Sequence, residues 1–142
     1  MVAESPYHYP AAASPVMSAL HATLRSFPIA CFTLALVFDI AYVQTANLLW
    51  LHFAEWLLFA GLVAGVAAIL LAGIEFLVRR VRPSWYAVLA ASIVLMLAAI
   101  NNFVHTADGW TAVMPFGLTL SILTVLGMIV TAVLTLRGVH HG

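Results

Sequence analysis

The sequence has no lysine, a single cysteine and few charged residues of either sign. Without lysine and with a formal net charge of zero, the chain lacks the basic surface that binds nucleic acid, so nucleic-acid partners are not expected. The lone Cys31 excludes a disulfide within the chain. Charged residues make up 7% of the sequence, against about 25% in an ordinary soluble domain. This scarcity of charge argues against a soluble protein.

Four long apolar runs account for most of the sequence instead, and hydrophobic residues reach 65% of the total. A helix needs about 20 apolar residues to cross a bilayer, and each run supplies most or all of that length. The first run, Phe27–Tyr42, is expected to begin as helix near Ser18. The other spans are expected over Leu48–Val78, from Pro83 to His105, and over Val113–Leu136.

These runs predict an all-α fold, an integral membrane bundle of four transmembrane helices. The expected division is a flexible cytoplasmic tail at residues 1–17 and a transmembrane domain at residues 18–139. Because the spans use up most of the chain, little remains for a soluble catalytic domain, and no stand-alone enzymatic activity is expected. Small residues from Gly61 to Gly65 should let a neighbouring helix approach the second span closely.

The arginines indicate how the bundle lies in the membrane. With four spans, both termini and the loop between the second and third spans fall on one side. All five basic residues then fall on that side, namely Arg25, Arg79, Arg80, Arg82 and Arg137. Because positive charge favours the cytoplasmic side, the termini are predicted to be cytoplasmic.

Ionisable and amide side chains gather at the opposite ends of the spans. They are Asp39 in the first span, His52 and Glu55 in the second, Asn101, Asn102 and His105 in the third, and Asp108 just beyond it. Placing a carboxylate in hydrocarbon costs about 2.5–3.5 kcal/mol, so such residues normally face the interior of a bundle and pair. We therefore expect these residues to form one polar layer in which Asp39 pairs with a histidine.

Three interpretations of this layer stay open. In the first, it is a polar network that fixes the register of the helices. In the second, His52 and His105 ligate a b-type haem, with Asp39 or Glu55 orienting an imidazole. In the third, a divalent metal ion such as zinc or iron is held by His52, Glu55 and His105. The spacing of the residues does not choose between them, because neither HExxH nor CxxC is present.

A smaller polar set lies near the cytoplasmic ends of the first two spans. His21 and Arg25 are four residues apart, as are Glu75 and Arg79, so each pair shares a helix face. This spacing permits a contact between Arg25 and Glu75, and Glu75 is also the expected partner of His21.

The order of several short motifs resembles a family of small bacterial membrane proteins catalogued as domain of unknown function 2231. The motifs are His21 followed by Phe27-Pro28-Ile29-Ala30, then Asp39, Ala72-Gly73-Ile74-Glu75, Asp108-Gly109, Gly117-Leu118-Thr119-Leu120-Ser121 and Arg137-Gly138-Val139. The resemblance covers about residues 18–139.

This resemblance implies a multi-pass protein of the bacterial inner (cytoplasmic) membrane and supplies no established activity. By analogy it suggests a membrane-associated dehydrogenase or another membrane subunit as partner. Together with the polar layer, it favours a small membrane subunit or anchor that carries electrons through haem b. The alternatives are a structural or interaction protein without a cofactor, and a membrane protein that binds a divalent metal.

Overall fold

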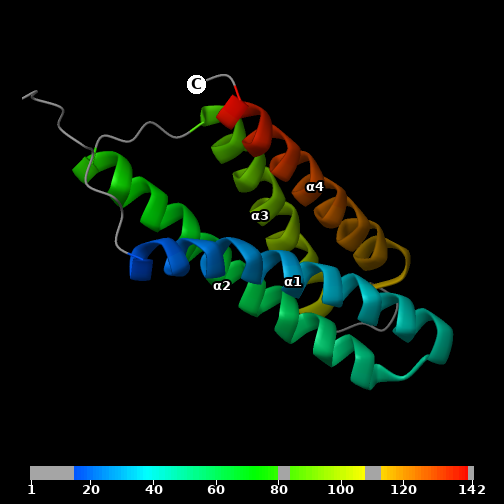
Figure 1. Ribbon diagram of the computed structural model, residues 1–142. Coiled ribbons are helices and arrows are strands. Elements are labelled where there is room, and N and C mark those ends of the chain that lie inside the picture. Colours follow the sequence, from blue (N-terminus) through cyan, green and yellow to red (C-terminus); the bar gives the residue numbers. More distant parts are fainter. Residues whose placement is uncertain (1–14, 80–83, 108–112, 141–142) are drawn as a thin grey trace, which may run out of the picture.

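The computed structural model describes residues 15–79, 84–107 and 113–140 (Figure 1). These residues form helices α1 (Pro15–Thr45), α2 (Leu48–Arg79), α3 (Trp85–Thr106) and α4 (Leu118–His140), with a short helical turn η1 (Val113–Gly117) before α4. All four helices are long and apolar enough to span a membrane, and the described part of the chain contains no strand. The predicted all-α transmembrane bundle is therefore confirmed.

The helix ends differ slightly from those expected. Helix α1 begins at Pro15 rather than near Ser18, and it continues past Tyr42 to Thr45. Much of the expected tail lies outside the described residues, as do Asp108 and most of the arginine-rich loop. The break between α1 and α2 is only two residues long. Ala46 has a positive φ of 51°, and the Asn47 side chain accepts a hydrogen bond from the backbone N–H of Leu49, which caps α2.

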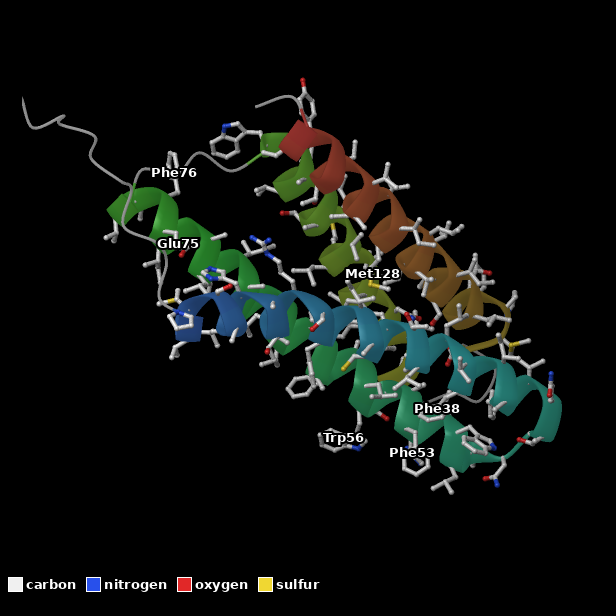
Figure 2. The ribbon with its side chains drawn as sticks, viewed as in Figure 1. Phe38, Phe53, Trp56, Glu75, Phe76 and Met128 are labelled. Carbon is white, nitrogen blue, oxygen red and sulfur yellow. The ribbon has the colours of Figure 1, made fainter. Side chains whose placement is uncertain are left out.

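The helices pack as two hairpins, α1 with α2 and α3 with α4 (Figure 1). Contacts between α2 and α3 and between α1 and α4 join the hairpins, so α1 and α3 lie diagonally across the bundle. We call the end that carries the α1–α2 break and the start of α4 the loop end, and the opposite end the terminal end. Figure 2 shows this separation along α2, where Glu75 and Phe76 lie far from Phe53 and Trp56.

Glycines allow the helices to approach closely. A Cβ atom added at Gly61 of α2 would lie 2.5 Å from Cε1 of Phe32 and 3.1 Å from Cβ of Cys31, both on α1. A Cβ at Gly65 would collide with Leu95 of α3. The prediction of a close helix approach along Gly61 to Gly65 is confirmed, and both glycines serve packing within one bundle.

The core lies in the half of the bundle nearer the loop end. Its buried apolar side chains are Phe32, Ala35, Ala54, Leu58, Val94, Ala98 and Met128. Closer to the terminal end than Pro28 of α1, Gly65 of α2, Val94 of α3 and Met128 of α4, no residue whose burial the structure describes is buried. The fold therefore provides one tightly packed region, and the expected polar layer lies beside it.

Candidate functional site

Asp39 is buried because of its position on α1. It shares a helix face with Phe32 and Ala35, which are seven and four residues earlier and lie in the core. Only 1% of Asp39 is exposed. The packing of α1 against its neighbours thus places a carboxyl group inside the bundle, as expected from the cost of exposing it to lipid.

The partner of Asp39 is His105 of α3. The Nε2 atom of His105 lies 2.8 Å from Oδ1 of Asp39, and 5% of His105 is exposed. The other ring nitrogen, Nδ1, lies 2.9 Å from the backbone carbonyl oxygen of Asn101, one turn earlier on α3. The prediction that Asp39 faces the bundle and pairs with a histidine is confirmed, and the pair bridges the diagonal between α1 and α3.

Ser121 of α4 completes the site. Its hydroxyl donates to Oδ2 of Asp39 at 2.5 Å, and its oxygen accepts a hydrogen bond of 2.7 Å from Nδ2 of Asn101. Ser121 and Asn101 are 1% and 0% exposed. We call Asp39, Asn101, His105 and Ser121 the buried polar cluster; its hydrogen bonds connect α1, α3 and α4.

The hydrogen bonds fix the number of protons in the buried polar cluster. A carbonyl oxygen only accepts, so Nδ1 of His105 carries a hydrogen that it donates to Asn101. Ser121 gives its one hydroxyl hydrogen to Oδ2 of Asp39. The contact between Nε2 of His105 and Oδ1 of Asp39 then requires one further proton. Asp39 and His105 therefore share one proton and have no net charge together, whichever atom holds it.

His52 and Glu55 form a separate pair on α2. Nδ1 of His52 lies 3.6 Å from Oε2 of Glu55, and the two side chains are 67% and 31% exposed. The structure thus brings Asp39 and His105 together but leaves His52 on an exposed face. Glu55 is nevertheless close enough for its charge to act on His105.

The geometry does not fit the haem arrangement expected from the sequence. Both ring nitrogens of His105 are occupied by hydrogen bonds, and His52 does not face it across the bundle. Within the described residues, no three His, Cys, Asp or Glu side chains are close enough to hold a metal ion. Haem or metal binding would require His105 to leave Asp39, and both hypotheses stay predictions.

Ser121 is the member of the buried polar cluster that the sequence named only within a family motif and did not place in the polar layer. Serine is common on membrane helices, where its hydroxyl usually bonds to its own backbone. The available signal is its spacing: Ser121 lies between Gly117 and Thr124, four residues after the first and three before the second, and all three are buried. This spacing identifies the inward face of α4.

A second pair lies toward the terminal end. Nε2 of His21 on α1 is 3.0 Å from Oε2 of Glu75 on α2, and Nδ1 of His21 bonds to the backbone oxygen of Met17. The expected pairing of His21 with Glu75 is confirmed. The alternative contact between Arg25 and Glu75 is not among the ion pairs of the described residues.

Comparison with known families identifies the chain. A model of the predicted membrane proteins called DUF2231 matches residues 17–140, which is most of the sequence. The chain belongs to the DUF2231 family. The matched region contains the buried polar cluster and all four helices except the first two residues of α1, so the cluster lies inside the DUF2231 domain. No curated protein and no solved structure matches the chain.

Proposed function

We propose that this DUF2231 protein is a small membrane subunit in which Asp39 and His105 bind and exchange one proton. The observation that carries the proposal is the 2.8 Å contact between Nε2 of His105 and Oδ1 of Asp39 inside the bundle, which requires one proton between the two atoms. Ionisable residues within a membrane domain are costly, and they commonly mark proton relays or ion pathways.

The rival function is purely structural. Hydrogen bonds between helices stabilise a bundle, but uncharged side chains such as serine and asparagine are sufficient to make them. A buried ion pair usually adds little net stability relative to apolar residues of similar size. Two fully buried ionisable partners are therefore better explained by proton binding than by stability alone.

The protein is proposed to work with a partner rather than as an enzyme by itself. A membrane-associated dehydrogenase or another membrane subunit remains the proposed partner, in the bacterial inner membrane with both termini cytoplasmic. The arginine distribution supports this orientation.

An NMR titration of the protein in lipid, with ¹⁵N-labelled histidine, tests the proposed proton site. The signals of His105 are assigned by their loss in His105→Gln. We expect Nδ1 to stay protonated throughout the titration while Nε2 changes its protonation state. The Asp39→Asn variant should alter this titration because its amide cannot hold the shared proton.

His52→Gln provides the matched control, because His52 is exposed and lies outside the buried polar cluster. Its loss should leave the His105 titration nearly unchanged. Signals of His105 that are the same at every pH would overturn the proton-binding proposal and leave the structural function.

A further inference from the structure

Asn101 has a buried oxygen without a partner. The residue is fully buried, and no described group donates a hydrogen bond to its Oδ1. The orientation of the amide is fixed by its neighbours. Because Ser121 uses its only hydrogen on Asp39, its oxygen must receive a hydrogen from Asn101, which therefore presents Nδ2 to Ser121. The oxygen of the amide is left facing elsewhere.

The next residue has the same feature. Oδ1 of Asn102 is also buried and has no hydrogen-bond partner among the described residues. A buried acceptor left unpaired costs about 1–3 kcal/mol. Such atoms in natural proteins are usually satisfied by internal water. Two adjacent amides with open acceptors therefore point to hydration of this part of α3.

The two asparagines lie near the loop end, and packed apolar layers separate them from the terminal end. Asn101 and Asn102 lie in the last turns of α3, which ends at Thr106 at the loop end. Toward the terminal end, the next layer contains Ala35 and Ala98, which have no exposed surface. Beyond them, Phe32, Leu58 and Val94 fill the core. Close packing of apolar side chains leaves little room for water there.

The ionisable groups near His105 also lie toward the loop end of the bundle. Asp39 faces His105 from α1, and Glu55 acts on it from α2; α4 contributes no ionisable side chain that the structure describes near His105. Glu55 is partly exposed and pairs with the exposed His52 at the loop end. The ionisable side chains near His105 therefore belong to the half of the bundle nearer the loop end.

We propose that water enters from the loop end and binds at Oδ1 of Asn101 and Asn102, so that Asp39 and His105 exchange their proton with the aqueous phase on that side alone. This inference rests on the proposed proton-binding function and adds the direction of access. The apolar core separates the pair from the terminal end.

Cysteine accessibility tests this direction. In a Cys31→Ala background, Asn102→Cys places a thiol beside the proposed water, outside the buried polar cluster. Val94→Cys places a thiol in the apolar core, about two turns earlier on α3, where cysteine is similar in size to the valine it replaces. Both variants are placed in sealed vesicles of known orientation, and a small, charged, membrane-impermeant thiosulfonate is added to either face.

We expect Asn102→Cys to react when the reagent reaches the loop end. From either side, Val94→Cys should react at least about tenfold more slowly than Asn102→Cys does from the loop end. Reaction of Asn102→Cys only from the terminal end, equal rates at both positions, or no reaction at Asn102→Cys would each overturn the inference. The ¹⁵N titration of His105 separates the two proposals: a titrating histidine with unreactive Asn102→Cys removes the access route and leaves proton binding in place.

Discussion

Asp39 and His105 meet at 2.8 Å across the diagonal of the bundle, between two helices that otherwise share little contact. Neighbouring helices in this fold are held by apolar packing and by close approach at glycines. The diagonal pair is different, because it links the two hairpins through hydrogen bonds at the centre. Its loss should therefore affect the association of the hairpins more than their individual formation.

Replacing only one member of this pair should destabilise the protein strongly. In Asp39→Leu, Nε2 of His105 and the hydroxyl of Ser121 lose their acceptor, and breaking a buried pair in this way costs about 3–5 kcal/mol. The double variant Asp39→Leu/His105→Leu should recover part of this loss. Thermal unfolding in detergent measures both, and His52→Leu is the exposed control. An Asp39→Leu protein that unfolds at the wild-type temperature would contradict the prediction.

Substituting alanine for glycine should have opposite effects on stability at two positions of α2. Gly61→Ala must displace the buried Phe32 ring, and such overpacking costs about 1–3 kcal/mol. A Cβ at Gly73 meets nothing within 4 Å, so Gly73→Ala gains only helix propensity, up to about 1 kcal/mol. The unfolding temperature should fall for the first variant and hold or rise for the second. Equal changes would show that α1 and α2 do not pack as described.

The turn between α1 and α2 offers a third test. Ala46 has a φ of 51°, a conformation that costs a residue with a Cβ about 1–2 kcal/mol. Ala46→Gly removes this cost, partly offset by the greater freedom of glycine in the unfolded chain, whereas Ala46→Val increases it. We expect the unfolding temperature to be highest with glycine at this position, lower with alanine and lowest with valine. The reverse order would exclude the left-handed conformation at this position.

The orientation in the membrane can be tested at two exposed positions. Cysteines are introduced one at a time at Asn47, in the α1–α2 break, and at Ser84, just before α3, in a variant without Cys31. An impermeant maleimide added to intact cells should label Asn47→Cys and leave Ser84→Cys unlabelled until the membrane is opened. The opposite pattern would invert the proposed topology.

An absorption spectrum of the purified protein tests the haem hypothesis. The haem hypothesis predicts a Soret band after growth with a haem precursor, whereas the engaged nitrogens of His105 and the exposed position of His52 predict none. A band that disappears in both His52→Ala and His105→Ala would instead establish bis-histidine ligation. It would also show that His105 leaves Asp39 when haem binds.

The sequence predicts the four helices because long apolar runs have few other stable structures in a bilayer. It also predicts the pairing of Asp39 with a histidine, since an isolated carboxylate is costly there. It does not predict that His52 faces away from the interior of the bundle. In a helix that is apolar on all sides, no polar face marks the direction of the interior. Only packing shows that Leu51, Ala54 and Leu58 face inward, which turns His52 outward.

The partners of Asp39 come late in the chain, 66 residues later for His105 and 82 for Ser121. During synthesis from the N-terminus, α1 and α2 therefore enter the membrane before either partner exists. Until α3 and α4 arrive, the Asp39 carboxyl in the α1–α2 hairpin has neither of these partners. Completion of the buried polar cluster therefore waits for α3 and α4, and a chain cut short before α3 lacks both hydrogen-bond partners of Asp39.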